Sequence, residues 1–194
     1  MTAGLILAAG RGTRFGGGKM LAEIDGRPML QHVLDRAAEA ELRPVIVVLG
    51  DDADQIEAAV AWRGGETRVR NPDPSRGISS SVALGLGELR DDVDRVLVLL
   101  GDQPFLTLEN CRVITAAPRD PAKPIVAPRY DGVPGNPVLL ERAAWPLATQ
   151  LIGDRGMVQI FAAHPELIRY VDVQGDNPDI DTAADLATLS RGGG

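Results

Sequence analysis

The sequence predicts an α/β protein in which one mainly parallel β-sheet lies between two layers of helices. Three observations lead to this prediction: short β-rich runs alternate with helical patterns, several of these runs are continuously apolar, and the 194-residue chain is 44% hydrophobic. Alternating strands and helices are typical of α/β folds, and a strand covered by helices on both faces has no polar side. The length and apolar content suit a single core.

The predicted strands are rich in valine, isoleucine and leucine. They occupy residues 4–9, 44–50, 66–70, 95–101, 124–128, 135–140 and 168–173. Runs such as VIVVL and VLVLL contain no polar position, which indicates burial on both faces of the sheet.

Helical patterns fill the intervals between these strands. They cover residues 28–41, 52–62, 79–90, 107–117, 141–151, 155–163 and 182–190. Just before the strand at 135–140, the stretch YDGVPGN contains Asp-Gly and Pro-Gly turn signals. We therefore expect that strand to be a hairpin partner of its predecessor, which makes the sheet mixed.

Composition limits the classes of function. The net charge of −7 argues against nucleic-acid and anionic-membrane partners, and the single cysteine, Cys111, excludes a disulfide framework and a cysteine-rich zinc site. No apolar run approaches the roughly 20 residues of a membrane span. We expect one cytoplasmic domain over residues 1–190 and a disordered tail at 191–194.

The stretch LILAAGRGTRFGGGK, residues 5–19, joins the first predicted strand to a glycine-rich loop with cationic side chains. A dinucleotide fingerprint would need glycine at Phe15, and a Walker loop would need glycine at Thr13 and Ser or Thr at Met20. Backbone N–H groups together with Arg14 and Lys19 still suit a polyphosphate. The competing interpretation is a flexible loop with solvated cations.

Acidic residues follow the fourth and the last predicted strands. Asp102 comes just past VLVLL, after Gly101, where a carboxylate suits Mg²⁺, although an aspartate before Gln103-Pro104 also suits a turn. Asp179 and Asp181 precede a helix whose first residues, Thr182 to Asp185, form a predicted capping box.

Three serines follow Gly77 at the predicted start of a helix. Ser79, Ser80 and Ser81 offer hydroxyls that cap a helix or bind a base and ribose. We expect at least one of them to cap the helix. His32 and His164 have no ligating neighbour in sequence, and we interpret both as structural or surface residues.

Several motifs resemble those of the MobA-like nucleotidyltransferases, and among them most closely the molybdenum cofactor cytidylyltransferases. They are LAAGRGTRFGGGK, NPDPSRGISSSVALGL, LLGDQP, PGNPVLL, GDRG and DIDTAADL, in family order across nearly the whole chain. The resemblance implies a three-layer α/β/α Rossmann-like nucleotidyltransferase fold. It also implies transfer of CMP from CTP to the terminal phosphate of molybdopterin, with release of pyrophosphate.

The motifs and the resemblance together give an expected site. Arg14, Lys19 and Asp102 are the expected catalytic residues, and Asp102 and Asp181 the expected ligands of Mg²⁺, with Mn²⁺ as the alternative. The nucleotide-binding positions are Leu7, Ala8, Ala9, Gly10, Arg11, Gly12, Arg14, Lys19, Gly77, Ser79, Ser80 and Ser81. The acceptor-binding positions are Gln103, Asn136, Asp154 and Arg155.

Two departures from the family pattern affect the acceptor side. Asn136 stands where the cytidylyltransferases usually have histidine, and Met157-Val158 stands where they usually have Ala-Arg. Three alternatives therefore stay open: guanylyl transfer to molybdopterin, nucleotidyl transfer to a sugar phosphate, and a non-catalytic nucleotide-binding regulatory module. The resemblance also implies transient contact with a molybdoenzyme or its maturation chaperone.

Overall fold

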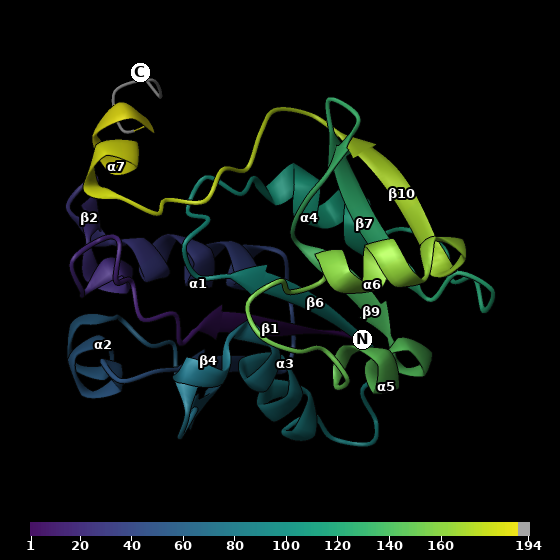
Figure 1. Cartoon of the computed structure of the whole chain (residues 1–194), viewed down its shortest axis with the longest axis horizontal. Helices are drawn as coiled ribbons and strands as arrows, with labels where there is room; N and C mark the ends of the chain where they lie inside the picture. Colours follow the sequence, from purple (N-terminus) through teal and green to yellow (C-terminus); the bar gives the residue numbers. More distant parts are fainter. Residues whose placement is uncertain (190–194) are drawn as a thin grey trace.

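The computed structural model describes residues 1–189 and consists of one mixed sheet with helices on both faces (Figure 1). The tail expected at 191–194 lies outside the described residues. The strands follow the order β10-β7-β9-β6-β1-β4-β5, and β8 pairs with β7. Their bounds are β1 Thr2–Ala8, β4 Val45–Leu49, β5 Glu66–Arg70, β6 Arg95–Leu100, β7 Ile125–Tyr130, β8 Val133–Pro134, β9 Val138–Glu141 and β10 Ile168–Val173. A two-stranded hairpin, β2 Glu23–Ile24 and β3 Arg27–Pro28, stands apart from this sheet.

Side chains of β1 alternate between the two faces of the sheet, and each face carries its own core. Ile6 and Ala8 pack with the helices α1 and α4, whereas Leu5 and Leu7 pack with α3 and α5. The helices are α1 Met29–Glu39, α2 Ala53–Ala59, α3 Ile78–Gly87, α4 Leu108–Thr115, α5 Trp145–Ala148, α6 Val158–Ala163 and α7 Ala183–Leu189. Helices on both faces explain why the central strands are continuously apolar.

The prediction of a mixed sheet is confirmed. Strand β9 runs antiparallel to both β6 and β7, and the short β8 runs antiparallel to β7. The pairs β1–β4, β1–β6, β4–β5 and β7–β10 are parallel. The turn residues between β7 and β9 therefore reverse the chain as their sequence indicated.

Two predicted helices fall furthest short of their expected length. The helix expected at 52–62 ends at Ala59, and the amide side chain of Gln31 binds both backbone groups of Ala61, which holds the chain out of helical geometry. The helix expected at 141–151 divides into a 3₁₀ turn, Arg142–Ala144, and the single turn of α5. No described helix is long and apolar enough to span a bilayer.

The parallel strands bring four loops to one edge of the sheet. The carboxyl ends of β1, β4, β5 and β6 lie side by side because their registers align along the sheet. Ligands of open α/β sheets bind outside such carboxyl ends. The glycine-rich loop follows β1, Asn71 follows β5, and Asp102 lies two residues beyond β6.

Candidate functional site

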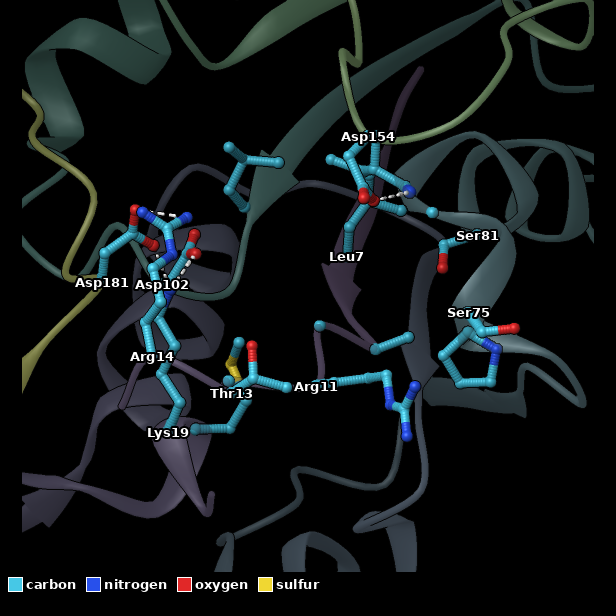
Figure 2. Close-up of a pocket in the computed structure, with 18 residues that line it drawn as sticks. Leu7, Arg11, Thr13, Arg14, Lys19, Ser75, Ser81, Asp102, Asp154 and Asp181 are labelled. Carbon is cyan, nitrogen blue, oxygen red and sulfur yellow. Dashed lines mark hydrogen bonds and ion pairs between the residues drawn. The ribbon is translucent and has the colours of Figure 1, made fainter. Parts of the chain in front are cut away.

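A cleft of about 470 Å³ opens at this edge of the sheet, between the glycine-rich loop and the start of α3 (Figure 2). Its lining comes from the β1 loop, the loop before α3, the end of β6 and two later segments. The residues are Leu7, Ala9, Gly10, Arg11, Gly12, Thr13, Arg14, Lys19, Met20, Pro74, Ser75, Gly77, Ile78, Ser81, Leu100, Asp102, Asp154 and Asp181.

The glycine-rich loop folds back on the carbonyl of Gly12. That oxygen accepts hydrogen bonds from the backbone N–H groups of Phe15, Gly16 and Gly17, at 2.9, 3.1 and 3.2 Å. Gly12 has a φ of +55°, and a Cβ there would lie 2.9 Å from the Cβ of Lys19. Glycine therefore permits both the turn and the close approach of Lys19.

Lys19 lies between two carboxylates at one end of the cleft. Its Nζ is 2.6 Å from Asp102 Oδ2 and 2.9 Å from Asp181 Oδ1, while Arg14 Nη2 is 3.0 Å from Asp181 Oδ2. Lys19 is only 6% exposed. Burial by itself lowers the pKa of Lys19, but the charges and hydrogen bonds of Asp102 and Asp181 outweigh it and raise the pKa above its ordinary value. The ammonium group therefore stays charged at neutral pH.

The two candidate acids before α7 occupy different surroundings. Asp181 lines the cleft, whereas Asp179 accepts a 2.6 Å hydrogen bond from Gln103 Nε2. Loss of hydration, followed by the charge of Asp102, raises the pKa of Asp179, and the hydrogen bond from Gln103 opposes this shift. Of the two, Asp181 is the residue that faces Lys19.

The predicted capping box is present next to Asp181. Thr182 Oγ1 accepts from the Asp185 N–H at 3.1 Å, and Asp185 Oδ2 accepts from the Thr182 N–H at 2.8 Å. Capping of α7 thus uses Thr182 and Asp185 and leaves the carboxylate of Asp181 available to the cleft.

The expectation that a serine caps α3 is wrong. The N-cap residue is Gly77, and Asp154 Oδ1 from a distant loop accepts from the Ile78 N–H at 3.2 Å. Gly77 has a φ of +88°, and a Cβ there would lie 2.4 Å from the carbonyl carbon of Gly153. The 153–154 loop therefore packs directly on the start of α3, and only glycine fits between them.

The hydroxyls of Ser79, Ser80 and Ser81 form hydrogen bonds with other groups of the protein. Asn71 Nδ2 donates to Ser80 Oγ at 2.8 Å and to Ser81 Oγ at 3.0 Å, and Ser80 Oγ donates to the Gly77 carbonyl at 2.8 Å. Ser79 Oγ lies 3.4 Å from the carbonyl of Arg76. These contacts fix the shape of this end of the cleft.

The cleft contains some of the expected site residues and not others. Leu7, Ala9, Gly10, Arg11, Gly12, Arg14, Lys19, Gly77, Ser81, Asp102, Asp154 and Asp181 line it. Ala8, Ser79, Ser80, Gln103, Asn136 and Arg155 do not. Ala8 is fully buried in the core on the α1 side. Gln103 is 5% exposed, the Asn136 carbonyl binds Tyr130 Oη and Asn177 Nδ2, and Arg155 is exposed outside the lining.

Sequence reasoning missed Asn71 and part of the lining. Asn71 is 6% exposed and joins the end of β5 to the serines of α3. The sequence feature that could have revealed Asn71 is an amide side chain directly after a predicted strand, at the edge of the sheet where ligands bind. Thr13, Pro74 and Ser75 lie inside motifs already singled out, next to the residues chosen.

The carboxylates of Asp102 and Asp181 fit a divalent cation. Both contact one ammonium nitrogen, so they are close enough to share a single cation. Within residues 1–189 no group of three or more His, Cys, Asp and Glu side chains could hold a metal. Mg²⁺ does not need such a group, because it is commonly held by one or two carboxylates, substrate phosphates and water.

Comparisons with known proteins identify the family of the chain. A family model described as the MobA-like NTP transferase domain matches residues 4–167. The bifunctional protein GlmU of Albidiferax ferrireducens is 37% identical over 120 residues, which is 58% of this chain and 26% of that protein. The chain thus spans only about a quarter of this curated relative.

Solved structures resemble nearly the whole chain. The crystal structure of Rv0371c from Mycobacterium tuberculosis H37Rv matches with a TM-score of 0.87 at 28% identity, covering 98% of this chain and 97% of that one. The structure of the same protein in complex with manganese matches with a TM-score of 0.85 at 28% identity, covering 98% of both chains. These matches share the α/β architecture described above.

Proposed function

The chain belongs to the MobA-like NTP transferase family, and we propose that it transfers CMP from CTP to the terminal phosphate of molybdopterin. The observation that carries the proposal is the convergence of Arg14, Lys19, Asp102 and Asp181 at one end of a cleft with a glycine-rich rim. Fixed cations and a pair of carboxylates at a glycine loop suit the triphosphate of a nucleotide.

The reaction forms a bond between a phosphate oxygen of the acceptor and the α-phosphorus of CTP. The bond from that phosphorus to the bridging oxygen of the β-phosphate breaks, and pyrophosphate leaves with its charge. A phosphate monoester is already anionic near neutral pH, so the attacking oxygen needs little help from a general base. Neither His32 nor His164 lines the cleft, which agrees with this requirement.

The chain contributes alignment and charge neutralisation. Lys19 is buried and stays protonated, so it presents a fixed positive charge to the phosphates, while the more exposed Arg14 adds a second charge. Asp102 and Asp181 would hold a divalent cation, Mg²⁺ or Mn²⁺, which neutralises phosphate charge when bound. The manganese complex of Rv0371c supports a divalent cation in this role.

The opposite end of the cleft suits the base and ribose. Gly77 and Ser81 present backbone groups and a hydroxyl there, and Ala9 lines the same cleft. Asn71 donates to Ser81 Oγ, and Asp154 accepts from the Ile78 N–H next to Gly77. A rigid set of donors and acceptors discriminates between bases because a mismatched base leaves polar groups unpaired. The preference for cytosine itself rests on the sequence motifs.

The acceptor site is proposed around the 153–155 loop. Asp154 lines the cleft and Arg155 lies next to it in the chain, with its side chain outside the lining. Asn136 and the Met157-Val158 pair depart from the cytidylyltransferase pattern. A sugar phosphate is therefore the second candidate acceptor.

The proposal is tested by measuring pyrophosphate release from CTP, GTP, ATP and UTP, with and without molybdopterin. We expect release that depends on molybdopterin and a kcat/KM highest for CTP. A preference for GTP would replace cytidylyl by guanylyl transfer. Release with a sugar phosphate but not with molybdopterin would overturn the acceptor, and no release with any combination would favour the regulatory module.

A further inference from the structure

The segment that carries Asp181 crosses the molecule before it reaches the cleft. We call residues 174–181, between the end of β10 and the start of α7, the C-terminal strap. Figure 1 shows it running from the β10 side of the sheet to α7 at the opposite side. Most of the strap has no secondary structure, so its path depends on contacts with the rest of the fold.

The strap is fixed next to Asp102 by a small group of contacts. The Ile180 N–H donates to the Asp102 carbonyl at 3.0 Å, and the Ile180 side chain is fully buried. Gln103 Nε2 donates to Asp179 Oδ1 at 2.6 Å and to the Asn177 carbonyl at 3.1 Å, while Gln103 Oε1 accepts from Asn177 Nδ2 at 3.0 Å.

These bonds occupy both polar atoms of the Gln103 side chain. Gln103 is 5% exposed and does not line the cleft, so it contacts the strap rather than a ligand. Its neighbour Asp102 and the strap residue Asp181 both contact Lys19. One buried amide therefore links the two segments that supply the pair of carboxylates.

We infer that Gln103 is a positioning residue, which holds the strap through Asp179 and Asn177 so that Asp181 stands opposite Asp102. The inference rests on the proposed function in one respect, that the two carboxylates share a divalent cation. Without Gln103 the Asp179 carboxylate loses its side-chain hydrogen bond, and the Asn177 side chain keeps only the Asn136 carbonyl, so water competes for both residues. Asp181 would then leave its position more often, even though its own side chain is unchanged.

The first test compares Gln103→Met with a matched control, Gln31→Met. Both glutamines are buried, at 5% and 7% exposure, and both donate to an aspartate, but Gln31 binds Asp35 on α1, away from the cleft. Two readouts are used on the full chain: Mn²⁺ binding in the presence of CTP, from the electron paramagnetic resonance of free Mn²⁺, and hydrogen exchange of peptides spanning the strap.

We expect Gln103→Met to weaken Mn²⁺ binding about tenfold and to speed exchange at Ile180 and Asp181 by at least as much. Gln31→Met should lower the melting temperature to a similar degree and change neither readout by more than about twofold. Equal effects of both variants would overturn the inference, since general destabilisation would then explain them. Unchanged strap exchange in Gln103→Met would also overturn it.

A second test separates positioning from charge. Gln103→Glu places a carboxylate against Asp179, so positioning predicts weaker Mn²⁺ binding, whereas added negative charge alone predicts tighter binding. In Gln103→Glu/Asp179→Asn the amide introduced at 179 can donate to the carboxylate at 103, and we expect binding within about threefold of wild type. Tighter binding by Gln103→Glu alone would overturn the inference.

The two proposals fail in different ways. If the wild-type protein binds no Mn²⁺ in the presence of CTP, the shared cation site of the proposed function fails. If hydrogen exchange in the strap is still faster in Gln103→Met but not in Gln31→Met, then Gln103 positions the strap even though the cation site is absent.

Discussion

The two ends of the cleft are held together by different kinds of contact. At the Lys19 end, Lys19 forms ion pairs with Asp102 and Asp181, which lie 83 and 162 positions away in the chain. At the α3 end, amide and hydroxyl groups form hydrogen bonds mostly with backbone groups and with residues close in sequence. Figure 2 shows Arg14, Lys19, Asp102 and Asp181 gathered on one side, with Ser75, Ser81 and Asp154 on the other. The Arg14–Asp181 pair is exposed to solvent, so a charged ligand can compete for its members. At the α3 end, hydrogen bonds within the protein hold the backbone and the side chains in place. The first end thus suits phosphates and a cation, and the second suits a base.

We expect the largest effect on catalysis from a substitution at the Lys19 end of the cleft. Asp102→Asn keeps the size of the side chain but removes its charge, so we expect kcat to fall by about a hundredfold to a thousandfold. The melting temperature should change little, because Asp102 lies at the cleft and outside both cores. Pyrophosphate release and thermal unfolding provide the two measurements. The control is Asp172→Asn, which removes an exposed partner of Arg129. A near-normal rate in Asp102→Asn at saturating Mg²⁺ would contradict the assignment.

The two cations of this end should differ in importance. Lys19 is 6% exposed and contacts both carboxylates, whereas the side chain of Arg14 is 75% exposed and contacts one. Exposed charges are hydrated and screened, so they contribute less. We expect Lys19→Ala to lower kcat/KM for CTP about a hundredfold and Arg14→Ala about tenfold, with Lys123→Ala as a surface control. Equal losses at both sites would break the distinction between a buried and an exposed cation.

The backbone frame of the other end is tested by Gly77→Ala. The positive φ of Gly77 and its contact with Gly153 leave no space for a methyl group, so the start of α3 must shift. We expect KM for the nucleotide to rise about tenfold and stability to fall by more than about 1 kcal/mol. Steady-state kinetics and urea unfolding measure the two effects.

A matched glycine lies at the other end of the same helix. A Cβ at Gly87 would meet nothing within 4 Å, so Gly87→Ala should leave KM unchanged and stabilise the protein by about 0.5–1 kcal/mol. If Gly77→Ala behaves like Gly87→Ala, the rigid frame at α3 does not control nucleotide binding.

Cys111 supplies a folding probe that touches neither end of the cleft. Burial raises the pKa of its thiol to about 12, and the side chain is fully buried in α4. The native thiol is thus neutral at pH 8, and we expect it to react with a disulfide reagent at least a hundredfold more slowly than in urea. Fast reaction in any cleft variant would show that its lost activity comes from unfolding.

The same shift predicts a dependence of stability on pH. Because the folded pKa of Cys111 lies above that of an unfolded thiol, about 8.5, its contribution is complete below that pH and is lost as the pH rises toward 12. Urea unfolding from pH 7 to pH 10 should show this loss in the wild type and less of it in Cys111→Ala. Parallel curves for both proteins would contradict it.

Much of the fold could be predicted from local patterns. Valine-rich runs marked the strands, and turn residues between 130 and 136 indicated the antiparallel β9. Helix ends were less predictable. The helix at 52–62 ended early because Gln31, thirty positions away, binds Ala61. Periodicity extends over a few residues and carries no information about such a partner.

By itself, the sequence determined that a glycine-rich loop with Arg14 and Lys19 and an acid at 102 would meet at one sheet edge, because parallel strands end together there. Only the tertiary structure decided that Asp154 caps α3 and that Gln103 binds the strap through Asp179 and Asn177. The physical reason is the separation in sequence over which each interaction acts. Strand and loop preferences are set by neighbours in the chain, whereas the partner of a buried amide or carboxylate is set by which distant segments pack against it.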